Sequence, residues 1–420
     1  MRRIGLFFLL GVAVVSLAPG ALAKGAAKKP TAHAAPPPTA THVAPPASAA
    51  PANKKIPQLS TTAASGCVLL ARGEVRCWGN FRTGPGTATS AVGTLAHSPP
   101  APVVVPELAG AEHLGVGFQM VCAETRGTLK CMGDNQGGRL GTGAIDPSTT
   151  PQEIQSFRGV ARFDADSLHT CAVTTAGSVW CWGYNAAGEV GDGSTRSQKR
   201  PSRAEVPGHA IDVAVGDEFS CAVVRGGDVY CWGLGDAGQL GGPAKDSCDI
   251  PEDGAMPCAK KPVKVAGLSK VKSITAGERH ACALLEDASV RCWGDNSTWQ
   301  LGGERKHALV DPGVAGATQV RAGNGHTCAV LGDGRATCWG WNKDGQLGDG
   351  TTTTRKEPTV VPGLADVVEI APSFLSTCAR TKQDELFCWG DNRWGQLGMA
   401  GEAHRLAPTK VELATHAAGK

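Results

Sequence analysis

The segment Ala322-Gly-Asn-Gly-His-Thr-Cys-Ala-Val330 continues through the turn Leu331-Gly-Asp-Gly-Arg335 into Ala336-Thr-Cys-Trp-Gly-Trp-Asn-Lys-Asp-Gly-Gln-Leu-Gly348. Variants of this unit recur seven times, and the first cysteine of each unit falls at 67, 122, 171, 221, 282, 328 and 378. Internal repeats of this length indicate a propeller, a solenoid or an array. Two short β-rich runs around a glycine-bearing turn predict a hairpin in each unit. Because few segments show helical periodicity, a helical solenoid is disfavoured.

The unit around Cys221 predicts the strand content of one blade. We expect strands at about 209–215, 219–224 and 228–233, and a further strand at 202–206 from the preceding segment, so that one blade can straddle two sequence units. The strands carry apolar residues on both faces, for example Val173 and Trp182. Sheets that are packed on both sides by neighbouring blades need this pattern.

The motif Cys-Trp-Gly-x-Asn-x-x-Gly-Gln-Leu-Gly resembles the repeat of the regulator of chromosome condensation family. It is clearest at 338–348 and 388–398, and weaker copies lie at 181–191, 231–241 and 292–302. The resemblance covers about residues 56–413 and implies an all-β, seven-bladed propeller. Two departures stand out: unit two has Met132 in place of Trp, and unit one lacks Gly-Gln-Leu-Gly. Closing the ring would bring together the end strands that contain Leu59 and Val411.

The chain begins with a segment typical of a secretory signal peptide. Arg2 and Arg3 precede an apolar stretch, and Ala21-Leu22-Ala23 fits a small-x-small cleavage site. We expect residues 1–23 to be removed on export. The apolar stretch is short for a membrane anchor, so the mature chain should have no transmembrane segment. The predicted location is secreted or periplasmic, within the cell envelope.

Residues 24–55 are predicted to be a disordered linker, and residues 56–420 the propeller. The linker contains 11 Ala, 7 Pro and no acidic residue, so it cannot bury enough apolar surface to fold. The whole chain carries a formal charge of +3, but the first 55 residues hold seven basic residues and no acidic one. The propeller itself is therefore at −4, which argues against a nucleic-acid partner.

Every cysteine has a partner at a fixed offset. In the hairpin around Cys171, pairing Val173 with Val179 places Cys171 opposite Cys181, within disulfide distance. Exported chains meet an oxidising compartment. We therefore predict one hairpin disulfide in each blade, joining Cys67 with Cys77, Cys122 with Cys131, Cys171 with Cys181, Cys221 with Cys231, Cys282 with Cys292, Cys328 with Cys338, and Cys378 with Cys388.

An eighth pair, Cys248 with Cys258, lies in an insertion that lengthens the fourth unit. We interpret it as a stapled surface loop, with a rigid recognition loop as the alternative, because a loop that is already ordered costs less to bind. Its acidic residues lack the spacing of a calcium loop. There is no Cys-x-x-Cys and the histidines are scattered, so zinc is disfavoured as well. The sequence predicts no metal and no cofactor.

Two polar positions recur within the units. His169, His280 and His326 each stand two residues before the first cysteine, and we expect them to hydrogen-bond within their own blades. Asparagine follows Cys-Trp-Gly or Cys-Met-Gly at a constant offset, and asparagine side chains commonly satisfy backbone groups in tight turns. That structural role is expected for Asn135, Asn185, Asn296, Asn342 and Asn392.

Four aromatic residues break the repeat in the loop after the Cys-Trp-Gly strand: Tyr184, Trp299, Trp341 and Trp394. Loop packing is the ordinary explanation. Exposed Trp and Tyr are also the usual anchors of binding surfaces, and loops carry function more often than cores do. If these loops share one face of the ring, the four side chains are the predicted binding site.

Reaction motifs are missing from the sequence: it contains no Gly-x-Ser-x-Gly, no His-Glu-x-x-His and no phosphate-binding loop. The favoured hypothesis is a non-enzymatic, monomeric binding scaffold for a protein or glycan partner. The first alternative is guanine-nucleotide exchange, which the family resemblance implies. The second is a hydrolase or lyase acting on a cell-wall polymer through carboxylates near the ring axis.

Overall fold

The computed structural model describes residues 58–70, 73–79, 101–166, 168–304, 309–401 and 403–413. All of them belong to one compact unit, Lys55–Lys420. The predicted signal peptide and linker lie outside the described residues. Among the described helical segments, which are two short 3-10 turns, η1 (Pro106–Leu108) and η2 (Gln136–Gly138), none could cross a membrane.

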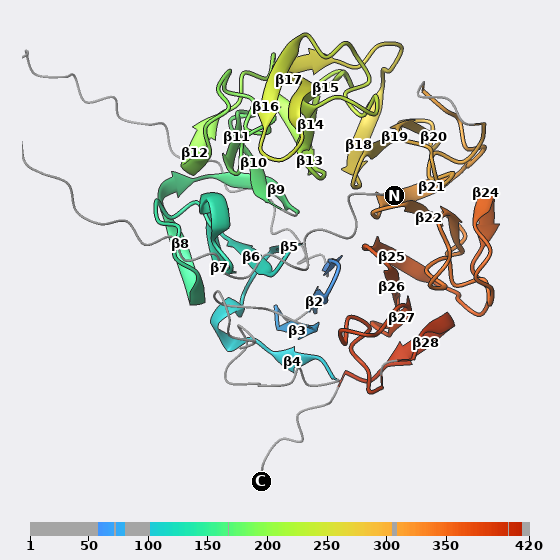
Figure 1. Ribbon diagram of the computed structural model, residues 1–420. Coiled ribbons are helices and arrows are strands. Elements are labelled where there is room, and N and C mark those ends of the chain that lie inside the picture. Colours follow the sequence, from blue (N-terminus) through green and yellow to red (C-terminus); the bar gives the residue numbers. More distant parts are fainter. Residues whose placement is uncertain are drawn as a thin grey trace, which may run out of the picture. The chain divides into compact units, whose positions relative to one another are not determined.

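The described strands form seven antiparallel sheets, arranged as blades around a common axis (Figure 1). The first three blades consist of β1 (Gln58–Thr61), β2 (Ser65–Leu69), β3 (Val75–Gly79) and β4 (Val103–Val104); β5 (His113–Gly117), β6 (Met120–Thr125), β7 (Thr128–Gly133) and β8 (Ser148–Arg158); and β9 (Val160–Ala165), β10 (His169–Thr174), β11 (Val179–Gly183) and β12 (Gln198–Arg203). In each of these blades the first strand faces the axis and the last lies at the rim.

The remaining blades follow the same order from the axis outward, except that blade four has β16 as a fifth strand paired with β17 and blade five has three described strands. They consist of β13 (Ala210–Val215), β14 (Phe219–Val224), β15 (Val229–Leu234), β17 (Gly254–Lys264) and β16 (Asp246–Ile250); β18 (Val271–Ala276), β19 (His280–Leu285) and β20 (Val290–Gly294); β21 (Ala317–Ala322), β22 (His326–Leu331), β23 (Ala336–Gly340) and β24 (Arg355–Val360); and β25 (Val367–Pro372), β26 (Ser376–Thr381), β27 (Leu386–Gly390) and β28 (Arg405–Val411). The predicted all-β, seven-bladed fold is confirmed. The strand expected at 202–206 runs over 198–203 instead, as the rim strand β12 of the preceding blade. The blade that begins with β13 therefore does not straddle two sequence units in the way expected.

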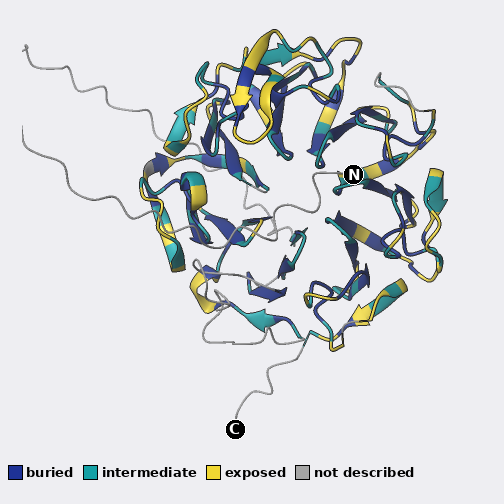
Figure 2. Cartoon of the chain, viewed as in Figure 1, coloured by how far each residue is buried: buried dark blue, intermediate teal, exposed yellow. Residues whose placement is uncertain are grey.

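The middle strands of the blades form the core, and the exposed residues gather at the rim and in the loops (Figure 2). In β14, for example, all six residues are buried, because both faces of the sheet pack against neighbouring blades. Side chains on one face contact the previous blade and those on the other face contact the next blade. The apolar residues predicted on both faces of the strands meet this requirement.

The predicted hairpin disulfides are confirmed in all seven blades. Each joins residues that lie directly opposite each other on the two middle strands, with Cα–Cα distances of 4.0–4.1 Å. In chain order the bonds join Cys67 to Cys77, Cys122 to Cys131, Cys171 to Cys181, Cys221 to Cys231, Cys282 to Cys292, Cys328 to Cys338, and Cys378 to Cys388. In the chain-entropy model, a loop of ten residues gains roughly 2.5–3 kcal/mol from such a cross-link.

The eighth predicted disulfide is confirmed as well. Cys248 bonds to Cys258 and thereby joins β16 to β17, at a Cα–Cα distance of 5.9 Å. Both cysteines are buried in a small apolar cluster with Ile250 and Leu234. The insertion is therefore a stapled hairpin that packs on its own blade and against Ala187 of blade three. No cysteine of the described chain is free.

A tryptophan in each Cys-Trp-Gly strand joins its blade to the blade before it. Its buried indole N–H donates to a backbone carbonyl in the Gly-Gln-Leu-Gly loop of the preceding blade. The acceptor is the residue that occupies the Gln position of that loop. The N–O distances are 2.6–3.0 Å for Trp78 to Gln396, Trp182 to Arg139, Trp232 to Glu189, Trp293 to Gln239, Trp339 to Gln300 and Trp389 to Gln346. The Trp78 bond crosses from the first blade to the last.

The ring closes between β1 and β25. The Thr61 hydroxyl donates to the carbonyl of Ala371 at 3.0 Å. Leu59 and Val411 lie in one apolar cluster with Trp78, so the two end strands meet through packing, in separate sheets. Blade one therefore completes the ring against blade seven without sharing a strand with it.

The asparagine prediction is confirmed, and the histidine prediction is wrong in one respect. Each of the five asparagines accepts, through Oδ1, the backbone N–H five residues later in its own turn. The histidines, however, bond across to the next blade: His169 to Ser220 at 2.7 Å, His280 to Thr327 at 2.9 Å and His326 to Thr377 at 2.9 Å.

The hydroxyl that each histidine meets is itself a donor to a backbone carbonyl; for example, Thr377 Oγ1 donates to Gln346 O at 2.8 Å. The hydroxyl oxygen must then accept from the imidazole Nε2–H, which fixes the neutral tautomer. All three imidazoles are buried, and desolvation lowers the pKa of His169 and His326 to about 3 and that of His280 to about 4. The three histidines are therefore neutral side chains that hydrogen-bond one blade to the next.

Candidate functional site

One face of the ring carries all four aromatic residues that the sequence singled out. In an antiparallel blade, the loops after the first and third strands lie at the same end. Backbone bonds join these loops in each case: Tyr184 N–H donates to Leu168 O at 3.1 Å, and Trp341 N–H donates to Gly325 O at 2.9 Å. We call this end of the ring the loop face.

Three of the four aromatic side chains are half-buried. Tyr184 lies against Gly137 of the preceding blade, and desolvation together with the nearby Glu189 carboxylate raises its pKa to about 12. The Trp299 ring is covered by the ammonium of Lys356, 5.3 Å from the ring centroid. Trp341 packs beside Gly325. These three side chains therefore serve packing between neighbouring loops.

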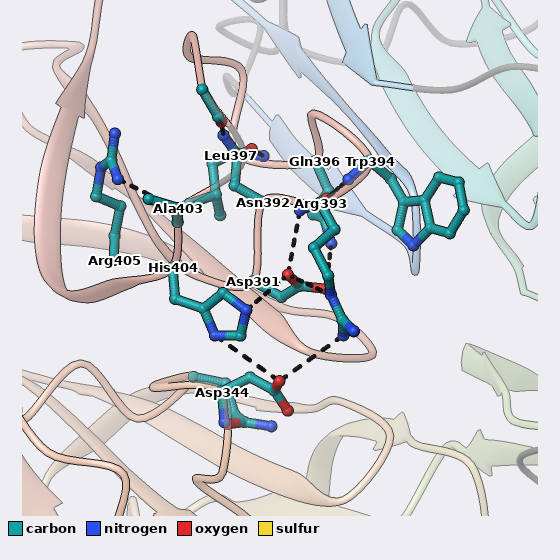
Figure 3. Close-up of polar contacts among 12 residues, drawn as sticks. Asp344, Asp391, Asn392, Arg393, Trp394, Gln396, Leu397, Ala403, His404 and Arg405 are labelled. Atoms are coloured by element: carbon teal, nitrogen blue, oxygen red, sulfur yellow. Dashed lines mark hydrogen bonds and ion pairs between the residues drawn. The ribbon is translucent and has the colours of Figure 1, made fainter.

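Trp394 is different, because its side chain is 48% exposed. Figure 3 shows the indole projecting away from the polar cluster behind it. Its backbone N–H donates to Gln396 Oε1 at 2.8 Å, and Leu397 N–H donates to Asn392 Oδ1 at 3.0 Å. The loop that carries Trp394 is thus held in one conformation by its own side chains.

Behind Trp394 lies a buried carboxylate, Asp391, with donors on several sides. The Arg393 Nε donates to both of its oxygens at 2.9 and 3.0 Å, and Gln396 Nε2 donates at 3.1 Å. His404 Nε2 lies 3.3 Å from Asp391 Oδ1. The carboxylate of Asp391 raises the pKa of the Arg393 guanidinium, which stays charged.

The cluster also reaches the neighbouring blade. Asp344 of blade six lies 3.8 Å from both Arg393 Nη2 and His404 Nδ1, so one carboxylate from each blade faces this pair of nitrogen groups (Figure 3). The cluster holds no hydroxyl or thiol nucleophile. It positions the exposed Arg393 and Trp394 side by side, and these are two of the residue types that dominate binding interfaces.

Sequence reasoning did not find this cluster, although it identified Trp394. The only local signal is Asp391-Asn-Arg393, where the clearest copy of the unit has Trp341-Asn-Lys343. His404 and Asp344 come from other segments, and a single sequence does not show that they converge. The described part of the chain contains no group of three or more His, Cys, Asp or Glu that could hold a metal ion.

Two carboxylates on axis-facing strands, of the kind that the hydrolase hypothesis requires, are already used between blades. Asp164 Oδ2 accepts Val215 N–H at 2.8 Å and Asp212 Oδ2 accepts Ile274 N–H at 3.1 Å. Desolvation raises the pKa of Asp212 to about 6 and raises that of Asp164 too. Each carboxylate thus connects one axis-facing strand to the next.

Comparison with known proteins agrees with this fold. A family model described as the RCC1-like domain matches residues 114–419. Human WBSCR16 is 21% identical over 81% of this chain and 94% of its own, with a TM-score of 0.68. Yeast RCC1 (Prp20), solved bound to Kap60, is 20% identical over 89% of this chain and 91% of its own, with a TM-score of 0.69. A search of curated proteins found no match.

Proposed function

The chain belongs to the RCC1-like domain family, and from that premise we propose that it is an exported, non-catalytic scaffold that binds a protein or glycan partner through its loop face. The observation that carries this proposal is Trp394, exposed on a loop whose backbone is fixed. An ordered loop loses little entropy when a partner binds, so more of the contact energy appears as affinity.

Export is supported by the eight disulfides, which persist in oxidising compartments. The predicted signal at residues 1–23 points the same way. A monomer is expected, because each blade is already covered on both sides by its neighbours. Arg393 extends the surface around Trp394 with a charged group that Asp391 holds in place.

The test compares capture of partners from the native cell-envelope fraction by the oxidised protein and by two variants. Trp394→Ala should reduce recovery of the specific partner at least tenfold, since a central aromatic contact contributes about 2 kcal/mol or more. Val360→Ala removes a similarly exposed apolar side chain from the rim strand β24, away from the loop face, and serves as the matched control. Equal capture by the Trp394 variant and the wild type would refute the proposed site.

Nucleotide exchange is the second candidate, because one of the structural neighbours is described by its binding properties to Gsp1p and histones. At 20% identity that neighbour shares the fold, and its binding partners belong to it alone. The measurement that separates the two candidates is release of labelled guanine nucleotide from a small GTPase. We expect no acceleration by this chain.

A further inference from the structure

The rim strands of blades three and four carry an unusual set of cations. Each of these two strands contains a proline. In both strands, basic residues occupy the two positions before the proline and the second position after it. In blade three these are Lys199, Arg200 and Arg203, and in blade four they are Lys260, Lys261 and Lys264. We call these six residues the basic rim. Five of them are exposed and Lys260 is half-buried.

The other rim strands do not share this charge. The same three positions hold Thr149, Thr150 and Glu153 in blade two, Lys356, Glu357 and Val360 in blade six, and Leu406, Ala407 and Lys410 in blade seven. Lysine and proline on an edge strand often serve to prevent strand addition by another chain. That requirement applies to every blade, so it does not explain why two adjacent blades carry all six cations.

The two halves of the basic rim differ in how they are neutralised. In blade four, Lys261 pairs with Glu205 at 2.9 Å and Lys264 pairs with Asp228 at 2.7 Å. In blade three, no carboxylate among the described residues pairs with the three cations. The carboxylate of Asp192, under β12, is occupied by Gln198 and Ser202 at 3.1 and 3.0 Å. Blade three therefore presents positive charge that no ion pair within the described fold neutralises.

Aromatic side chains accompany the cations in both blades. Trp180 lies opposite Arg203 and Tyr230 lies opposite Lys264 in the sheet register, and both rings are half-buried. Trp180 is braced by Phe157, with the ring centroids 6.0 Å apart. Aromatic faces stack against sugar rings, while lysine and arginine pair with carboxylate or sulfate groups. A surface that offers both suits a charged carbohydrate.

We propose that the basic rim binds a linear anionic polysaccharide. The propeller is at −4 overall, so the three cations of blade three, which pair with no carboxylate among the described residues, form with Lys260 a local reversal of charge that attracts a polyanion. Lys199 and Arg203 are four residues apart in β12, whose register is irregular between Gln198 and Ser202, so positive charge is spread along this strand. Blades three and four adjoin, since Gly193 N–H of the former donates to Lys260 O of the latter at 3.0 Å.

This surface is separate from Trp394, which lies in blade seven, and the proposal does not depend on the proposed function. The test uses the oxidised full-length protein and three probes: polygalacturonate, which carries carboxylates; dextran sulfate; and uncharged dextran. Both charged polymers should bind, uncharged dextran should not, and added salt should weaken binding because counterions screen the charges.

The decisive variant is the triple Lys199→Glu, Arg200→Glu, Arg203→Glu. Its matched control is Arg225→Glu, Lys270→Glu, Lys343→Glu, which changes the net charge equally at exposed positions outside the basic rim. The rim triple should lose affinity about tenfold or more while the control stays within about twofold of wild type. Both variants should keep the wild-type melting temperature, because none of the six side chains has an ion-pair partner among the described residues.

Two outcomes would overturn the proposal. Equal weakening by both triples would mean that only net charge matters. If single-stranded DNA or polyglutamate bound the rim as tightly as the polysaccharides, the ligand class would be wrong. Trp394→Ala should leave polysaccharide binding unchanged, so failure of one proposal is distinguishable from failure of the other.

Discussion

Two junctions between neighbouring blades are held together by different contacts: the junction of blade six with blade seven, and that of blade one with blade two. At the first, Trp389 donates to Gln346 O, His326 donates to Thr377, and Gln319 Oε1 accepts Ile370 N–H. At the second, the tryptophan, histidine and hydroxyl positions hold Met132, Ser65 and Val121. Among the described residues of this junction, the bonds beside the axis persist: Gln58 Oε1 accepts Leu114 N–H and Ser60 Oγ accepts Val116 N–H.

The comparison shows which contacts the two junctions share. Side chains of axis-facing strands reach the next axis-facing strand at both junctions, so these bonds are the common feature. The indole bond needs a carbonyl from the Gly-Gln-Leu-Gly loop, and unit one lacks that motif. Met132 instead packs in an apolar cluster with Leu69 and Val121. The two departures from the repeat are therefore related: without the Gly-Gln-Leu-Gly loop in unit one, an indole at position 132 would lack its carbonyl acceptor, and Met132 stands there instead.

The largest expected effect comes from truncating the indole at the complete junction. Trp389→Ala should lower the free energy of unfolding by about 3–5 kcal/mol, since it leaves a large cavity and an unsatisfied Gln346 carbonyl. Met132→Ala, at the simpler junction, should cost about 2–3 kcal/mol. Urea unfolding of both variants measures the contrast. Equal losses would show that the indole bond adds nothing beyond buried volume.

Removing a hairpin disulfide should lower the free energy of unfolding equally in blade six and in blade one. Replacing Cys328 and Cys338 by alanine should cost up to about 3 kcal/mol, and replacing Cys67 and Cys77 should cost the same, because both pairs span the same hairpin register. Thermal unfolding under non-reducing conditions checks this. A much larger loss in blade one would indicate that this blade depends on its cross-link more than the others do.

Acid should weaken the junctions that contain histidine. The pKa of His326 is about 3 in the fold and near 6.5 in the unfolded chain, so the unfolded state binds more protons between these values. Stability then falls with decreasing pH by about 1.4 kcal/mol per unit. Buried acids with raised pKa values, such as Asp212, act in the opposite direction, so the measure is the difference between wild type and His326→Gln.

The variant should show a shallower decline of stability than the wild type between pH 6 and pH 4, when both are measured by urea unfolding at each pH. Ser65→Ala in blade one, which replaces the residue at the histidine position there, is the control and should keep the wild-type slope. Parallel curves for wild type and His326→Gln would contradict the neutral buried imidazole.

The smallest effect is expected on the loop face. Trp394→Ala should change the free energy of unfolding by less than about 0.5 kcal/mol, because the side chain is largely exposed and the loop is held by Asn392 and Gln396. A large loss of stability would assign Trp394 to packing, together with Trp299 and Trp341, and would leave the loop face without its anchor.

Sequence alone predicted the features that repeat. The seven units, the opposed cysteines and the asparagine turns follow from spacing, because a hairpin of fixed length places the same atoms together in each copy. Contacts between units were harder to predict. The bond of His326 to Thr377 spans 51 residues, and only the closed ring brings those positions together.

The candidate site was predicted in part for the same reason. All four aromatic residues lie in equivalent loops, so their common face follows from strand alternation. Their exposure depends on the neighbouring blade: Lys356 covers Trp299, whereas Trp394 is 48% exposed. The cluster of Asp391, His404 and Asp344 required coordinates, since its members come from the two ends of one loop and from a loop of the neighbouring blade.

One measurement tests the central claim, that a ring of disulfide-pinned hairpins works outside the cytoplasm. The protein is isolated from its native source, treated with an alkylating reagent without reduction, and its intact mass is determined. The account predicts a mature chain beginning at Lys24 with none of the 16 cysteines alkylated. A chain that retains Met1 and carries alkylated thiols in most blades would contradict it.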